Sequence, residues 1–421
     1  MMKAATAGTI GSLLEWYDFY VFATASALVF GQLFFPGNDR VAGTIASFGV
    51  FAAGFLSRPL GGILFGHIGD TLGRRTSLLI TVGVIGAGTF LIGLLPTYHQ
   101  IGIWAPILLT LLRVLQGVGL GGEYAGASLI AIEHAPRSER GFWGSLPQAA
   151  SPAGLLLAAG AFGLVSLLPH DAFLAWGWRA PFLVSAVMVF AGLYIRLQVQ
   201  ETPEFNRTKD ANKDEAPGAE LLRTHWWNAL LATGARLAET VSGNMIKSFG
   251  LTYATLQLKL PQEVALTALT ATAAIGVLAT PFYGMLGDRI GQRRVYLGGC
   301  VLVGAIAVPF FMLLDVRTAT AVWVAFIVAY NFGPTLLLSV QPSLFTKMFD
   351  PGVRYTGMSV AYQVSSIAGG FTPLLSLWLL KLSGGTPWLV ATFLIAVAVV
   401  SFASVGSALV MEPRPRLLPT A

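Results

Sequence analysis

Several ionisable residues lie inside long apolar stretches of this sequence, where their positions favour proton and anion chemistry. Asp18 lies in the first stretch and Arg113 in the fourth. A charged side chain in the middle of a hydrocarbon layer costs roughly 2.5–3.5 kcal/mol or more, so such residues are expected to be paired and functional. We predict that Asp18 and Arg113 face each other, so that the carboxyl group can gain a proton when its partner moves away.

The same pair would connect a proton to an anion. Protonation of Asp18 would free Arg113, whose planar guanidinium suits a carboxylate. The other carboxyl groups expected to take part are Glu15, one helical turn before Asp18, and Glu123, in the same stretch as Arg113. The alternative is a static buried ion pair that only holds two helices together.

The seventh apolar stretch carries three further charges. Lys247 lies too deep for its ammonium group to reach the membrane surface easily. It is either an anion-binding group in a cavity or the salt-bridge partner of Glu239 or of a neighbouring helix. Arg236 and Glu239 are three residues apart and share one helical face, which predicts an ion pair between them.

Uncharged polar side chains in the apolar stretches can orient a bound carboxylate or hydroxyl group, although each is also suited to joining helices. Amides and phenols serve both purposes because they donate and accept hydrogen bonds. Together with Arg113 and Lys247, the candidate binding residues are Tyr20, Gln116, Gln148, Asn331, Tyr362 and Gln363.

The stretches that hold these residues have the length of membrane-spanning helices. Of the 421 residues, 55% are apolar and 11% are charged, against about 25% charged in an average soluble protein. Apolar runs near 20 residues cross a bilayer as helices, because lipid offers no partner to a loose backbone N–H or C=O. We predict twelve spans, at about residues 8–33, 42–66, 77–96, 103–131, 140–168, 179–200, 226–256, 262–286, 295–314, 319–346, 355–381 and 387–410.

The longest polar stretch, 201–224, is a predicted cytoplasmic linker between two units of six spans, 1–200 and 225–421. With the N-terminus placed inside, Lys and Arg are concentrated in the inner loops, which predicts that both termini lie in the cytoplasm. The same bias accounts for the net charge of +6. Nucleic acid is therefore not an expected partner, whereas membrane lipid is.

One short loop occurs twice, half a chain length apart. Residues 66–75 read GHIGDTLGRR, and residues 284–294 read GMLGDRIGQRR. The glycines permit a tight turn and a close approach of helices, and the aspartate can meet a helix N-terminus or an arginine. We predict a latch on the cytoplasmic side rather than a plain positive loop that only sets topology. Its residues are Gly66, Gly69, Asp70, Gly73, Arg74, Arg75, Gly284, Gly287, Asp288, Gly291, Arg293 and Arg294.

Arg58, at the end of the second stretch, is expected to belong to the same gate. Glu123 lies at a similar depth in the membrane, and Glu15 is the other carboxyl group within reach. We expect Arg58 to pair with one of these two residues.

The doubled loop resembles the signature loop of the major facilitator superfamily. Five further stretches resemble its metabolite:proton symporter branch: EWYDFY at 15–20, RPLGG at 58–62, RVLQGVGLGGEY at 113–124, WGWRAPF at 176–182 and ETPEF at 201–205. The resemblance implies an all-α membrane protein with twelve helices in two pseudo-symmetric lobes, working as a monomer by alternating access in a bacterial plasma membrane. It also implies proton coupling through an aspartate of the first helix and an arginine of the fourth.

The branch carries several classes of small molecule. The leading expectation is a proton-coupled symporter that imports a small organic acid, such as a di- or tricarboxylate or a shikimate-like hydroxy acid. The alternatives are a proton/zwitterion symporter for proline or betaine, and an exporter of metabolites or drugs from the same superfamily. The charge of the cavity decides between them, because an unpaired Lys247 favours an anion.

Other classes of protein are not expected. The sequence has no P-loop, which argues against transport driven by ATP. The five histidines show no metal-ligand spacing, and the single cysteine, Cys300, excludes both a disulfide and a cysteine-based metal site. No metal and no cofactor other than the coupling proton is expected, and the chain is not expected to be an enzyme.

Overall fold

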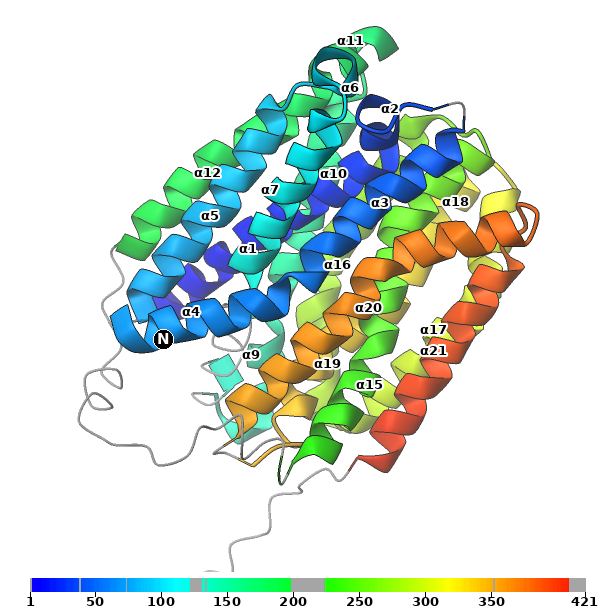
Figure 1. The fold of residues 1–421 in the computed structure, drawn as a ribbon. Coiled ribbons are helices and arrows are strands. Elements are labelled where there is room, and N and C mark those ends of the chain that lie inside the picture. The colour runs from blue at the N-terminus through cyan, green and yellow to red at the C-terminus, as the bar shows by residue number, and fades with distance from the viewer. Residues whose placement is uncertain are drawn as a thin grey trace, which may run out of the picture.

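The computed structural model describes residues 2–37, 39–72, 74–121, 131–132, 135–197, 223, 225–350 and 353–408. Within these residues every regular element is a helix. Figure 1 shows long helices running roughly side by side, with the first half of the chain in blue to green and the second half in green to red. The predicted linker lies outside the described residues except for Arg223, so its boundaries stay a prediction.

Six spans make up the first half, called here the N lobe. They are α1 (Met2–Ala25) with η1 (Ser26–Phe30) and α2 (Gly31–Leu33), α3 (Arg40–Leu56) with α4 (Arg58–Leu72), α5 (Arg74–Leu94), α7 (Trp104–Leu120), α9 (Arg140–Ser145) with η3 (Pro147–Ala149) and α10 (Ala150–Val165), and α12 (Ala180–Leu197). Short helices cover the connections: α6 (Tyr98–Ile101), η2 (Arg137–Glu139), α11 (His170–Ala175) and η4 (Gly177–Arg179).

Six more spans make up the second half, the C lobe. They are α15 (Trp226–Asn244) with η5 (Met245–Gly250) and η6 (Tyr253–Gln257), α16 (Gln262–Ile290), α17 (Gln292–Asp315), α18 (Ala319–Tyr330) with η7 (Asn331–Thr335) and α19 (Leu336–Phe345), α20 (Arg354–Leu382), and α21 (Trp388–Ser407). The twelve predicted spans are thus confirmed as helical segments, with end points that differ by several residues.

In the described part of the chain, seven helical stretches are long and apolar enough to cross a membrane by length and composition alone. Two further apolar stretches are shorter within the described residues, Leu79–Leu94 in α5 and Trp104–Leu120. Three of these seven, Arg40–Gly62, Arg140–Val165 and Ala319–Phe345, are built from more than one helical segment.

The irregular segments are mostly π-helical turns inside spans, and two of them lie in the middle of the C lobe. Pro334 lies within η7, where its missing N–H and its ring disturb the regular hydrogen-bond ladder. Lys247 and Asn331 both belong to such turns, η5 and η7. π-turns are frequent at functional sites, so η5 and η7 are candidates for carrying site residues.

Glycines set the distance between the helices of the N lobe. A Cβ on Gly117 of α7 would lie 2.0 Å from the backbone oxygen of Gly54 on α3, and one on Gly61 would lie 1.8 Å from the oxygen of Val118. Neither position has room for a side chain, so α3 and α4 lie almost backbone to backbone against α7.

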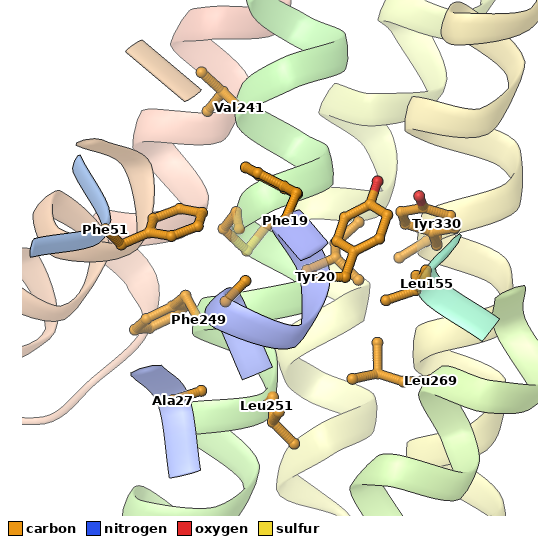
Figure 2. Packing of buried hydrophobic residues seen from close by; sticks show 14 of the residues in the cluster. Phe19, Tyr20, Ala27, Phe51, Leu155, Val241, Phe249, Leu251, Leu269 and Tyr330 are labelled. Atoms are coloured by element: carbon orange, nitrogen blue, oxygen red, sulfur yellow. The ribbon is translucent and has the colours of Figure 1, made fainter. Parts of the chain in front are cut away.

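The two lobes meet along two seams, where α10 packs against α16 and α3 packs against α20. The two ends of the molecule are called the linker end and the far end. The linker end is where α12 finishes and α15 begins, and the far end is where α2, α6 and α11 lie (Figure 1). Buried apolar side chains from both lobes fill the space between the seams, as Figure 2 shows for Phe19, Phe51, Phe249 and their neighbours.

Candidate functional site

A lysine from the C lobe reaches into the N lobe between the two seams. Lys247 lies on η5, and its Nζ donates a hydrogen bond of 3.0 Å to the hydroxyl of Tyr20 on α1. The Tyr20 hydroxyl shares a second hydrogen bond, of 2.6 Å, with Ser151 Oγ on α10. Three helices of two lobes therefore meet in one short chain of polar groups.

Aromatic rings enclose this chain. Lys247 Nζ lies 4.4 Å from the centre of the Tyr20 ring and 5.4 Å from that of Tyr330, and the Trp16 ring stacks on Tyr20 at 5.4 Å. Figure 2 shows the hydroxyl ends of Tyr20 and Tyr330 pointing the same way. Rings stabilise the ammonium group through their negative faces, but they leave its net charge in place.

In the described part of the chain, Lys247 has no carboxylate within ion-pair distance. Glu239 attracts it from further away, and Arg236 repels it. The carboxylate of Glu239 belongs instead to Arg236, with Oε2 3.4 Å from Arg236 Nη2. The ion pair of Glu239 is thus with Arg236 and not with Lys247, and anion binding by Lys247 stays a prediction.

The Arg236–Glu239 pair occurs where the spacing predicted it, and further bonds hold it in place. Arg236 Nη1 donates to the backbone oxygen of Tyr362 at 3.0 Å, to Ser365 Oγ at 2.8 Å and to Ser366 Oγ at 2.9 Å. The guanidinium also lies 3.6 Å from the centre of the Tyr362 ring. Arg236 thus joins α15 to α20 inside the C lobe.

Arg113 is enclosed by rings, with 2% of its side chain exposed. Its guanidinium carbon lies 4.3 Å from the centre of the Phe22 ring and 5.1 Å from that of Phe51. Nη1 donates to Gln116 Oε1 at 3.3 Å, and Gln116 Nε2 donates to Thr89 Oγ1 at 2.6 Å. The sequence did not indicate the ring enclosure, because it forms between side chains of three different spans.

Asp18 is buried in the same lobe and acts electrostatically on Arg113. The contacts described for Arg113 are with aromatic rings and with the side-chain amide of Gln116. Direct pairing of the two residues therefore stays a prediction. The side chain of Glu15 and the whole of Glu123 lie outside the described residues. The expected pairing of Arg58 with one of these two carboxyl groups therefore stays a prediction. The guanidinium carbon of Arg58 lies 4.2 Å from the centre of the Phe55 ring.

The remaining binding candidates lie in different places. Asn331, on η7, is buried beside α10 and α16. Gln148 is buried on η3, and Gln363 donates to the backbone oxygen of Gly121 at 3.1 Å, across the seam between the lobes. Ser151 was missed at the sequence level, because a serine within a helix usually bonds its own backbone and gives no signal of its own.

The second copy of the latch loop joins the lobes at the linker end. Asp288 accepts hydrogen bonds from the backbone N–H groups of Gly141 and Phe142, at 2.7 and 2.8 Å, at the start of α9. A Cβ on Gly284 would lie 2.6 Å from the Gly141 oxygen, and Gly291 has a φ of +97°. The expected contact of the aspartate with a helix N-terminus is therefore present, together with the close approach and the tight turn.

Other residues of the latch are only partly placed. Gly287 packs against Val340, Arg293 donates to the backbone oxygen of Gly406 at 2.6 Å, and Arg294 is exposed. Nothing is described of the first copy's Gly73, or of the side chains from Gly66 to Arg75 that the prediction named. Among the described residues, no group of three or more histidine, cysteine or acidic side chains is arranged for a metal.

Known proteins share both the fold and the sequence. Residues 4–219 match the family model described as sugar (and other) transporter, and residues 229–420 match the one for the major facilitator superfamily. The shikimate transporter of Escherichia coli (strain K12) is 39% identical over 406 residues, which cover 95% of this chain and 92% of that protein. The proline/betaine transporter of the same organism is 34% identical over 419 residues, covering 95% of this chain and 82% of the relative.

Solved structures agree on the architecture. A crystal structure of a D-xylose–proton symporter superimposes with a TM-score of 0.73 and 18% identity, covering 95% of this chain and 97% of that one. Together with the family models, these matches define a two-lobed membrane transporter and not an enzyme. The chain belongs to the major facilitator superfamily, and its relatives within it are metabolite transporters.

Proposed function

We propose that this transporter is a proton-coupled symporter that imports a small organic acid by alternating access. The observation that carries the proposal is the Lys247 ammonium group, held between the lobes by the hydroxyl and ring of Tyr20 and by the ring of Tyr330. No carboxylate in the described part of the chain lies within ion-pair distance of it. A poorly compensated cation at this place is suited to a substrate carboxylate, because burying the anion then costs little.

The same hydrogen bond links substrate binding to movement of the lobes. A carboxylate that binds Lys247 competes with the hydroxyl of Tyr20, and the contact that it replaces joins the C lobe to the N lobe. Substrate binding therefore changes the balance of contacts between the two lobes, which is what a ligand needs in order to shift a conformational equilibrium.

For the proton we retain Asp18 as the leading carrier. It is buried in the N lobe and interacts electrostatically with Arg113. Movement that weakens this interaction makes the charged carboxylate costlier and so favours proton uptake. Glu15 and Glu123 are the next carboxyl groups to test. We further propose that the linker end faces the cytoplasm of a bacterial cell, with both termini there, and that the monomer is the working unit.

A zwitterion such as proline or betaine is the second candidate. The stacked rings of Trp16 and Tyr20, with Tyr330 nearby, resemble the aromatic surroundings that bind quaternary ammonium groups. Lys247 occupies this place, however, and would repel a second cation. An organic anion is therefore the better match.

The test is uptake into proteoliposomes driven by a proton gradient, with labelled organic acids, proline and betaine as the panel. We expect one or more acids to accumulate, and Asp18→Asn to exchange the substrate without concentrating it. Lys247→Gln should abolish uptake of the acid, whereas Lys259→Gln, at an exposed lysine beyond η6, serves as the matched control.

Three results would change the proposal. If Asp18→Asn still accumulates the labelled acid, another carboxyl group must carry the proton. Accumulation of proline or betaine alone would replace the substrate class, and normal acid uptake by Lys247→Gln would remove Lys247 from the site.

A further inference from the structure

We infer that the site takes an acid with one carboxylate and several hydroxyl groups, and that Ser151 and Asn331 recognise the hydroxyl groups. The inference rests on the proposed function and narrows it, because it separates polyhydroxylated monocarboxylates from di- and tricarboxylates. It follows from counting the charges and the hydrogen-bonding groups around Lys247.

The count of charges favours a single carboxylate. In the described spans, Arg113 is closed off by Phe22 and Phe51, and Arg236 is tied to Glu239 and to α20. Of these three cations, Lys247 is the one that is only partly buried, and its described hydrogen bond is to a phenol. A second carboxylate in the same place would be buried near Glu239 without a cation of its own, which is costly.

The groups next to Lys247 are hydroxyls. Tyr20 and Ser151 share a hydrogen bond of 2.6 Å, and the phenol of Tyr330 lies beside them. A hydroxyl group both donates and accepts, so each of these can bind a substrate hydroxyl in either sense. In the structure the hydroxyl groups of Tyr20 and Ser151 are hydrogen-bonded to each other. This contact keeps the site compact until a substrate hydroxyl replaces it.

Asn331 supplies an acceptor that lacks a donor. Its amide nitrogen donates to the backbone oxygens of Thr272 and Ile327, at 3.2 and 3.0 Å. Both partners are carbonyls, which accept only, so the orientation of the amide is fixed. The side chain is 2% exposed, and Oδ1 has no hydrogen-bond donor among the described residues. A buried acceptor without a donor is destabilising, and a substrate hydroxyl would correct this.

The unpaired oxygen lies close to the segment that holds Ser151. A Cβ placed on Gly276 would lie 3.2 Å from Asn331 Oδ1 and 3.0 Å from the Cβ of Pro152, the residue that follows Ser151. Asn331 Oδ1 therefore lies near the segment of α10 that carries Ser151, and Asn331 directly follows Tyr330, whose ring centre is 5.4 Å from Lys247 Nζ. A compact ring that carries a carboxylate and hydroxyl groups on neighbouring carbons matches this arrangement.

The experiment compares inhibition of uptake by three acids built on the same cyclohexane ring, in the wild-type protein. They are a tetrahydroxycyclohexane carboxylate, cyclohexanecarboxylate and cyclohexane-1,3-dicarboxylate. A site built around hydroxyl groups discriminates strongly against an analogue that lacks them. We expect the hydroxylated acid to bind at least ~100-fold more tightly than either of the others.

Variants locate the recognition. Ser151→Ala should weaken binding of the hydroxylated acid by roughly tenfold, which corresponds to the loss of about one hydrogen bond. Binding of cyclohexanecarboxylate should stay within about twofold of its wild-type value. Ser151→Cys, which keeps the size of the side chain, guards against a folding defect. Asn331→Leu should act in the same direction, and Ser185→Ala, at a buried serine that bonds only its own helix on α12, is the matched control.

The outcomes separate this inference from the proposed function. Tighter binding of the dicarboxylate, or an equal effect of Ser151→Ala on all three acids, overturns the inference while organic acid transport stands. If the panel of acids, proline and betaine shows no acid uptake at all, the proposed function fails and the inference fails with it.

Discussion

At the scale of single residues, most of the charge buried in the membrane-spanning part of the C lobe is already committed. Arg236 is bound by Glu239, by two serines and by a backbone oxygen, and both members of the ion pair are largely buried. Removing one partner of such a pair leaves an uncompensated charge, which is far costlier than removing both.

Glu239→Gln should therefore destabilise the protein strongly, by about 3–5 kcal/mol. Thermal unfolding in detergent measures the effect. Glu263→Gln, at an exposed glutamate in the first turn of α16, provides the control and should melt close to the wild type. Equal melting of the two variants would show that Arg236 finds compensation elsewhere.

What the sequence reveals about residues depends on how local the interaction is. Arg236 and Glu239 are neighbours on one helix, so their spacing alone predicted the pair. The rings around Arg113 come from different spans, and the partners of Lys247 come from the other lobe. Contacts of this kind follow from how helices pack, which hydropathy and spacing do not specify.

At the scale of helices, length and hydropathy predicted the twelve spans, but not their interruptions. The π-turns η5 and η7 place Lys247 and Asn331 at the site. An extra residue in a turn depends on tertiary packing and on the surrounding hydrogen bonds, and apolar composition does not report it. The spans were thus predictable, while the direction of the side chains that they present was not.

Helix packing in the N lobe gives a sharp prediction at Gly117. A Cβ there would lie 2.0 Å from the backbone oxygen of Gly54 and the same distance from Ser57 Oγ. Because backbone cannot move aside cheaply, Gly117→Ala should push α7 away from α3 and cost about 1–3 kcal/mol.

The control is Gly83→Ala on α5, where an added Cβ meets no atom within 4 Å among the described residues. There the better helix propensity of alanine should raise the melting temperature slightly. A melting temperature for Gly117→Ala at or above that of the wild type would contradict the close approach of the two helices.

At the scale of the whole molecule, the polar contacts between the lobes differ at the two ends. At the linker end, Asp288 accepts from two backbone N–H groups and Ser343 donates to the backbone oxygen of Arg140. At the far end, Lys381 and Asp39 form an ion pair of 3.1 Å with both side chains about half exposed. Exposed ion pairs contribute little to stability, whereas charge-assisted bonds at a helix terminus are stronger.

The far-end pair should not contribute to the pH dependence of transport. The hydrogen bond from Lys381, helped by backbone N–H groups at the start of α3, holds the pKa of the Asp39 carboxyl below its ordinary value. A lowered pKa means that the contact is complete above the ordinary value of about 4 and is lost only as the pH falls through the lower one.

Lys381→Gln should therefore change the uptake rate by the same factor throughout the range from about pH 5 to pH 8. The measurement is initial uptake over that range, at a fixed proton gradient. A change in the shape of the profile would show that the pair titrates at higher pH than its contacts imply.

The latch at the linker end should control separation of the lobes there. Spin labels on the exposed residues Ser138 and Arg294 report this distance, and the native Cys300 is buried and does not interfere. Asp288→Asn weakens the hydrogen bonds that Asp288 accepts from the backbone N–H groups at the start of α9. This substitution should shift the distribution of distances between the two spin labels toward longer values. Asp171→Asn, at an exposed aspartate of the far end, should leave it as in the wild type, and an unchanged distribution for Asp288→Asn would exclude a latch.

The unequal contacts at the two ends have a consequence for the order of events in a transport cycle. Among the polar contacts of the described residues, opening at the far end breaks an exposed ion pair, whereas opening at the linker end breaks a charged helix cap. Without substrate, the transporter should therefore be open mainly at the far end, and substrate should bind first from that side. Such a bias favours entry from one side but leaves the equilibrium ratio of cargo across the membrane unchanged, because a preference between two empty conformations supplies no net free energy over a complete cycle.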